Sequence, residues 1–241
     1  MNKREITTDG CRKHRPIAGG CRDCRSGRSG GVLENVDVSA TLLEVARAFA
    51  IEPARPRRSL LIVSNIREEE GLMGADHFAH CLTVAVGQIV SGVDLDMPML
   101  LYDFTDVVAY GAQHSTLSAA IVKAGAAMNI KLSPGPTQQA ATFVRSDHDA
   151  LVRQGVPAVM LATGMANGGA KARLKYVSTN CHQPSDDISR PIFWDSGAKF
   201  ARLNYLISRE RANSDQAPQW YAGDYFGDQY ASGAAKSGKV K

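Results

Sequence analysis

The stretch Ser59-Leu60-Leu61-Ile62-Val63-Ser64 leads directly into Asn65-Ile66-Arg67-Glu68-Glu69-Glu70-Gly71-Leu72-Met73-Gly74. A short, continuously apolar run of this kind predicts a buried strand. The glycine-marked segment that follows predicts the start of a helix. Carboxylates would then stand at the carboxyl edge of a sheet, which is where α/β proteins place ligands and metals.

Two further segments could bring metal-binding side chains to the same edge. Asp94-Leu95-Asp96 follows another apolar run, and His182 lies in a polar stretch. Zinc in hydrolytic sites takes histidine nitrogens and carboxylate oxygens and keeps one position open. Because adjacent residues of an extended chain point in opposite directions, one of Glu68 and Glu69 can bind metal while the other acts as a base.

Each of these groups also has a simpler structural interpretation. Glu68-Glu69-Glu70 could be an acidic helix start that the helix dipole favours. Asp94 and Asp96 could solvate the end of a strand, and His182 could be a solvated loop residue. None of the three segments identifies a metal site by itself.

The composition is that of a soluble globular protein, and 241 residues are enough for one domain with a sizeable core. Apolar runs fall short of the roughly 20 residues that a membrane helix needs, and residues 1–30 lack the apolar segment of a signal peptide. We therefore expect a cytoplasmic location by default and no membrane span. Residues 1–30 carry a net charge of +5, which leaves the remainder at −1. Such a basic segment could touch nucleic acid or anionic lipid, but its composition favours a disordered leader, so we expect no nucleic-acid partner.

Strands that alternate with helices predict an α/β fold with a mostly parallel, mixed sheet and helices on both faces. Apolar spacing predicts helices over 39–50, 74–83, 115–127, 146–154 and 192–207, and strands over 59–64, 89–93, 107–110, 130–132 and 157–163. Residues 164–191 are read as a long polar loop, a length that usually has a functional reason. The domain organisation that we predict is a leader over 1–30, a catalytic domain over 31–213 and a polar, aromatic surface tail over 214–241.

The order of four segments resembles the zinc aminopeptidases of peptidase family M28. Glu68-Glu69-Glu70-Gly71-Leu72-Met73-Gly74 is similar to the family's Glu-Glu-x-Gly-Leu-Leu-Gly, and Asp94-Leu95-Asp96-Met97-Pro98 to its Asn-x-Asp-Met. Arg145-Ser146-Asp147-His148 with Gly155-Val156-Pro157-Ala158 resembles its Ser-Asp-His and Gly-Val-Pro-Ala pair. Cys181-His182-Gln183-Pro184-Ser185-Asp186-Asp187 resembles its Tyr-His-x-x-x-Asp. The resemblance extends from about residue 31 to about residue 210.

The resemblance implies a metallopeptidase with zinc as cofactor, two ions in the family and possibly one here, and a peptide as substrate. Glu68 would be the general base that activates water, Glu69 and His182 would bind one zinc, and Asp96 would bind the other. The family's bridging Asp precedes a helix, and Glu34 stands at that position. Glutamate is longer than aspartate by about 1.5 Å, whereas metal sites tolerate ligand displacements on the order of 0.2 Å. The backbone at Glu34 would therefore have to retreat. Alternatively, Asp37 could replace Glu34, provided that the local register shifts.

The family's remaining ligand is the His of a His-x-Asp segment, and only His14 precedes Glu34 at a suitable interval. Pro16 stands at the position of that Asp, so His14 lacks the carboxylate that would orient its imidazole. The family's first strands also find no counterpart here, so we expect an N-terminally shortened member. In another interpretation, Cys11, His14, Cys21 and Cys24 form a structural zinc site.

The function that we predict is a zinc-dependent peptidase of the aminopeptidase type. One alternative is a catalytically impaired or non-catalytic relative, suggested by Glu34 and the missing His-x-Asp segment. Another is a one-zinc enzyme like the glutaminyl cyclases, with Glu69, Asp96 and His182 as ligands. Analysis of the product from a peptide with N-terminal glutamine separates cyclisation from hydrolysis. The sequence does not indicate an oligomeric state.

Overall fold

A four-stranded mixed sheet forms the centre of the molecule. The computed structural model of the chain describes residues 31–135 and 140–239, and its strands are β1 (Gly92–Leu95), β2 (Asp106–Tyr110), β3 (Lys131–Ser133) and β4 (Ala158–Thr163). Their order in the sheet is β1-β4-β2-β3, with β1 parallel to β4, β2 parallel to β3, and β2 antiparallel to β4. The predicted α/β fold with a mostly parallel, mixed sheet is therefore confirmed.

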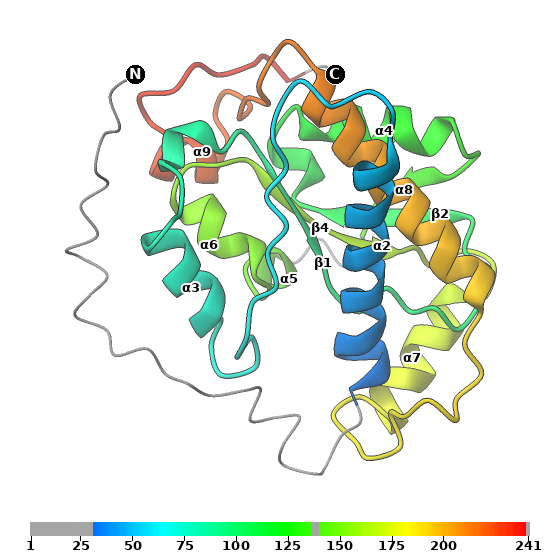
Figure 1. Cartoon of the computed structure of the whole chain (residues 1–241). Helices are drawn as coiled ribbons and strands as arrows, with labels where there is room; N and C mark the ends of the chain where they lie inside the picture. Colours follow the sequence, from blue (N-terminus) through cyan, green and yellow to red (C-terminus); the bar gives the residue numbers. More distant parts are fainter. Residues whose placement is uncertain (1–30, 136–139, 240–241) are drawn as a thin grey trace.

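Helices cover both faces of this sheet (Figure 1). One side holds α2 (Asp37–Ile51), α4 (Leu117–Ala126) and α8 (Trp194–Asn213), and the other holds α3 (Met73–His80), α5 (Ala140–Phe143), α6 (His148–Arg153) and α9 (Tyr225–Tyr230). The remaining helical segments are η2 (Val32–Val36), η3 (Val86–Gln88), η4 (Ala112–His114) and α7 (Gly169–Thr179). No helix in the described part of the chain is long and apolar enough to cross a bilayer.

The core is divided by the sheet into two clusters, as the alternation of side chains along a strand requires. On β2, Val107 and Ala109 pack into the cluster that contains Phe200 and Leu203 of α8. The intervening Val108 and Tyr110 face the other cluster, which includes Phe143, Val152, Trp220 and Phe226. All five residues of β2 are buried. Such a strand reads as continuously apolar because both of its faces are covered.

The predicted strand over 59–64 is wrong. These residues have no regular secondary structure, and Leu61 and Ile62 are 50% and 42% exposed. The segment lines a cavity of about 800 Å³ whose opposite wall is formed by Val90–Leu95. The apolar run therefore lines this cavity and does not form a strand of the sheet.

Two other expectations also need correction. Residues 164–191, which were expected to form a loop, contain the helix α7. This helix buries only Gly169 and Tyr176, so its sequence shows little of the apolar spacing that identifies a helix. Residues after 213 were expected at the surface, but Trp220 and Phe226 are buried. The indole Nε1 of Trp220 donates to the carbonyl of Gly155 at 2.9 Å, so this part of the chain packs on the core.

Candidate active site

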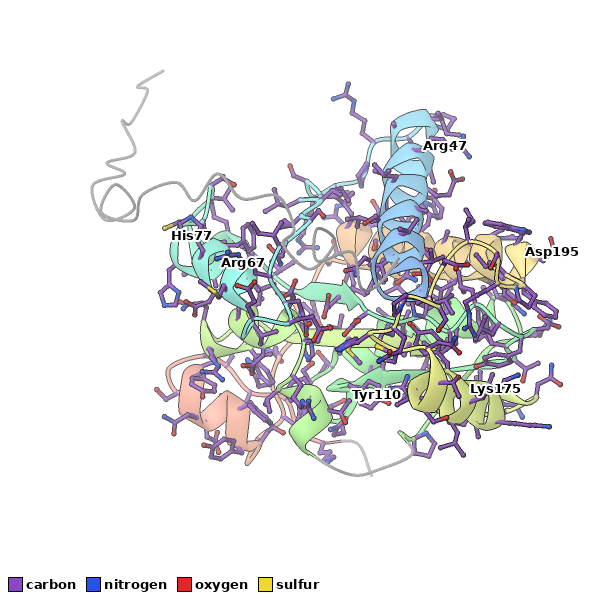
Figure 2. The ribbon with its side chains drawn as sticks, turned by 90° about the horizontal axis from the view of Figure 1, so that it is seen from below. Arg47, Arg67, His77, Tyr110, Lys175 and Asp195 are labelled. Atoms are coloured by element: carbon purple, nitrogen blue, oxygen red, sulfur yellow. The ribbon has the colours of Figure 1, made fainter. Side chains whose placement is uncertain are left out.

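The turn that carries Glu68 and Glu69 is fixed by backbone hydrogen bonds to the start of α3. The N–H of Leu72 donates to the carbonyl of Glu68 at 2.8 Å, and the N–H of Gly74 donates to the carbonyl of Ile66 at 3.0 Å. A Cβ at position 74 would overlap the backbone of Ile66. The predicted glycine-marked helix start is therefore confirmed, although no strand precedes it, and Arg67 marks this turn in Figure 2.

Glu69 and His182 meet, as the resemblance implies. The Nε2 of His182 lies 2.9 Å from Oε1 of Glu69, and both side chains are about half exposed. Glu69 comes from the turn before α3, while His182 comes from the loop after α7. The loop is closed by Asp186, which is fully buried and accepts from the N–H of Leu33 and from the hydroxyl of Tyr176.

Left-handed backbone recurs at the predicted site residues. His182 has φ 57°, Arg67 just before Glu68 has φ 61°, and Met97 just after Asp96 has φ 45°. This region is uncommon for residues other than glycine and costs free energy, so it persists only where the surroundings enforce it. Three such positions at one place are typical of a functional site.

Asp94 is held by two side chains from the segment that precedes β4. Its Oδ2 accepts from the Ser146 hydroxyl at 2.6 Å and lies 3.2 Å from Nδ1 of His148. Ser146 and His148 are both 2% exposed. Asp94 is therefore engaged within the protein, whereas Asp96 lies just beyond the carboxyl end of β1 at the predicted sheet edge.

The pKa values of three carboxyl groups are raised at this edge. Burial and then the charges of Glu69 and Asp96 raise the pKa of Glu68 to about 8. Burial and the charge of Asp94 raise the pKa of Asp96 to about 6. Burial and Asp94 likewise raise the pKa of Asp147 to about 6, although Asn65 donates to it at 3.0 Å. Such a concentration of carboxyl groups favours a cationic ligand.

The two doubtful ligands cannot be placed. Glu34 lies in η2, but its side chain is outside what the structure describes, and His14 precedes the described residues. The alternative zinc site of Cys11, Cys21 and Cys24 is also outside them. Within residues 31–135 and 140–239, no three His, Cys, Asp or Glu side chains gather closely enough to hold a metal ion.

Sequence reasoning assigned no metal-binding or catalytic role to the residues Asp147, Ser146, His148 and Asp186, which all contribute contacts here. The signal was present, since Ser146-Asp147-His148 and the Asp that follows His182 belong to the segments that carry the resemblance. Asn65 gave no signal, because its contact with Asp147 depends on how two distant segments pack.

Comparison with known proteins identifies the family of this chain. The family model of Peptidase family M28 matches residues 22–207, which is more than half of the chain. The chain belongs to peptidase family M28. No curated protein gives a significant match.

Several solved structures resemble this M28 chain in fold. An aminopeptidase from Aneurinibacillus sp. strain AM-1 superposes with TM-score 0.60 at 18% identity, over 78% of this chain and 42% of that one. The LapA aminopeptidase of Legionella pneumophila gives TM-score 0.62 at 17% identity, over 78% and 48%. A peptidase M28 precursor from Shewanella amazonensis gives 0.56 at 15%, over 78% and 39%. At these identities the likeness shows the fold, and the chain spans less than half the length of each of these proteins.

Three side chains of this M28 chain are of the types that bind zinc, although no three such groups gather closely enough to hold a metal ion among the described residues. Glu69, Asp96 and His182 supply the oxygen and nitrogen donors that zinc prefers. A fourth carboxyl group, Asp37 at the start of α2, is buried, and this burial raises its pKa to about 8 although the backbone N–H of Val38 opposes the shift. A buried carboxylate in that state is costly unless it takes up a proton or a cation.

Proposed function

We propose that this chain is a zinc-dependent metallopeptidase of the aminopeptidase type. The observation that carries the proposal is the position of Glu68, a partly buried carboxyl group beside the contact between Glu69 and His182. A base whose pKa lies near the working pH transfers protons efficiently. When bound, zinc supplies a Lewis acid for the scissile carbonyl and a positive charge that favours ionised carboxylates.

In the proposed reaction, Glu68 takes a proton from the attacking water as the oxygen of that water bonds to the peptide carbonyl carbon. Glu68 then delivers the proton to the leaving nitrogen as the carbon–nitrogen bond breaks. Glu69, Asp96 and His182 would hold the metal. The surrounding carboxyl groups suit the positively charged amino terminus of a peptide, which supports an aminopeptidase over an endopeptidase.

Substitution of Glu68 by Gln tests this role, with Glu70→Gln as the matched control. Glu70 is a neighbour whose carboxylate lies 3.4 Å from Nε of Arg67 in an ion pair. In zinc-loaded protein with aminoacyl chromogenic substrates, we expect Glu68→Gln to lower kcat by about 100-fold or more, while Glu70→Gln stays within about threefold of wild type. Acetylation of the substrate amine should abolish turnover. Equal turnover of the Glu68→Gln protein and the wild type would remove Glu68 from the mechanism.

A non-catalytic role is the second candidate, and the lack of three converging donors among the described residues favours it. Zinc content per chain after dialysis separates the two. About two zinc ions together with turnover support the enzyme. A chain without bound zinc and without turnover supports the non-catalytic candidate.

A further inference from the structure

The cavity between residues 59–64 and β1 has the size and the lining of a binding site for a small molecule. Its volume of about 800 Å³ lies within the range of ligand pockets, roughly 300–1,000 Å³. Residues of α2, α3, α8 and β1 line it together with the segment that passes between α2 and α3 (Figure 1). Most of its lining side chains are apolar, and they include Leu42, Val45, Phe78, Val90, Val93 and Leu95. These walls suit an apolar chain.

Two arginines, Arg58 and Arg211, line this cavity where α8 ends. The N–H of Arg58 donates to the carbonyl of Ala212 at 3.0 Å, and its Nη1 donates to the carbonyl of Arg211 at 3.3 Å. The Nη2 of Arg211 donates to the carbonyl of Gln216 at 2.7 Å. Both guanidinium groups are therefore held beside one end of the cavity by neutral carbonyl groups.

No carboxylate of the described residues forms an ion pair with either of these two guanidinium groups. The neighbouring arginines do have such partners, since Arg57 pairs with Asp215 and Arg209 pairs with Glu52. The Nε of Arg211 is buried and has no hydrogen-bond partner in the described part of the chain. Burial, and then the like charge of the second arginine, lower the pKa of Arg211. An anion at this end of the cavity would offset the repulsion and accept the free N–H.

Asn204 of α8 brings a second unused polar atom to the cavity. The residue lines the cavity and is 2% exposed. Its Nδ2 donates to the carbonyl of Phe200 at 2.9 Å, which orients the amide, and its buried Oδ1 has no partner among the described residues. This oxygen is an acceptor, so it requires an N–H or O–H donor. The edge strand β1 lines the same cavity, and an edge strand offers backbone groups that bind an amide.

We infer that this cavity binds an N-acylated amino acid with apolar groups, that is, an apolar chain, an amide and a free carboxylate in one molecule. The carboxylate contacts Arg211, the amide N–H donates to Asn204, and the apolar groups lie against α2, α3 and β1. Glu68, Glu69 and His182 do not line the cavity. The inference is therefore independent of the proposed peptidase activity and goes beyond it.

Isothermal calorimetry of the metal-free full chain with N-octanoyl-leucine tests the site. We expect N-octanoyl-leucinamide, which lacks the carboxylate, to bind the wild-type protein about tenfold more weakly or worse. N-decanoyl-leucine should bind more tightly than the octanoyl compound, by about fourfold for each added methylene. These comparisons use ligands alone and leave the protein unchanged.

Arg211→Gln should lower the affinity for N-octanoyl-leucine about tenfold or more and remove the discrimination between acid and amide. Arg209→Gln is the matched control, because Arg209 is exposed on the same helix and does not line the cavity. This variant should stay within about threefold of wild type.

Equal wild-type affinities for the acid and the amide overturn the inference, and so does the absence of binding at about 1 mM N-octanoyl-leucine. Dodecanoate has a similar length and a carboxylate but no amide. If it binds as tightly as N-octanoyl-leucine, the amide assignment is wrong. If Arg211→Gln does not fold, the comparison of acid and amide on the wild-type protein decides alone.

Discussion

The Nε2 of His182 and Oε1 of Glu69 lie 2.9 Å apart, although one residue precedes α3 and the other follows α7. Both side chains are about half exposed, and exposed ion pairs contribute at most about 1 kcal/mol to stability. This ion pair alone therefore does not explain why His182 adopts left-handed backbone at φ 57°. A shared ligand explains the arrangement better, since a metal would need both side chains at one place.

We predict that His182→Ala and Glu69→Gln each lower zinc affinity tenfold or more. Each substitution removes one donor, while the loss of an exposed ion pair leaves the fold intact. Calorimetric titration of the metal-free proteins measures the effect. His77→Ala is the matched control, because His77 is exposed on α3 away from the sheet (Figure 2). If His182→Ala binds zinc as wild type does, His182 is not a ligand.

The stability of the metal-free protein should fall as the pH rises from about 4 to about 8. The folded-state pKa values of Asp37 and Glu68 are about 8, above their ordinary values of 3.8 and 4.5. The folded state therefore binds more protons than the unfolded state in this window, and the free energy of unfolding decreases with pH. Urea midpoints at pH 5 and pH 8 measure the decrease, and Asp37→Asn should reduce it.

Zinc should counteract this pH dependence. Ligands bind metal in their deprotonated form, so zinc affinity should rise between pH 6 and pH 8 with release of protons. Urea midpoints at saturating zinc then differ less between pH 5 and pH 8 than those of the metal-free protein. A metal-free protein that is more stable at pH 8 than at pH 5 would contradict the raised pKa values.

Gly74 is predicted to be essential for the turn that carries Glu68. A Cβ there would overlap the backbone of Ile66, which cannot move aside as a flexible side chain could. Gly74→Ala should cost roughly 1–3 kcal/mol of unfolding free energy and reduce turnover. Gly87→Ala is the control, since a Cβ at that position meets nothing within 4 Å. Equal urea midpoints for the two variants would show that the turn relaxes freely.

Tyr176 is predicted to stabilise the loop of His182 through Asp186. Its hydroxyl donates to the fully buried carboxylate of Asp186 at 3.1 Å. Tyr176→Phe should lower the free energy of unfolding by roughly 1.5–3 kcal/mol, the range for hydrogen bonds to charged groups. Tyr225→Phe, at a tyrosine that is 68% exposed, should change it by less than about 0.5 kcal/mol. Denaturant unfolding compares them, and equal losses would refute a specific role for the bond.

The parts of the fold that local patterns predict are those in which packing follows the pattern. β2 and β4 are buried on both faces, so their apolar runs identify them. The apolar run over 59–64 is similar to these, yet a strand also needs a neighbour to pair with, and a cavity lies between this run and β1. A single segment of sequence contains no information about that pairing.

The candidate site shows the same division. Glu68, Glu69, Asp96 and His182 were predicted from segment order, and the contact between Glu69 and His182 agrees with it. The contacts of Ser146 and His148 with Asp94 depend on how α6 packs against β1. The spacing of residues along the sequence does not reveal that packing. The π-helical turn over Val32–Val36 likewise has no local signal in the sequence.

The most direct test of the account is the anomalous-scattering map of zinc-soaked crystals at the zinc absorption edge. The account predicts a peak about 2.0–2.2 Å from donor atoms of Glu69 and His182, with a carboxylate of Asp96 bound to the same peak or to a second one beside it. A peak elsewhere, with Glu69 and His182 free of metal, would contradict it.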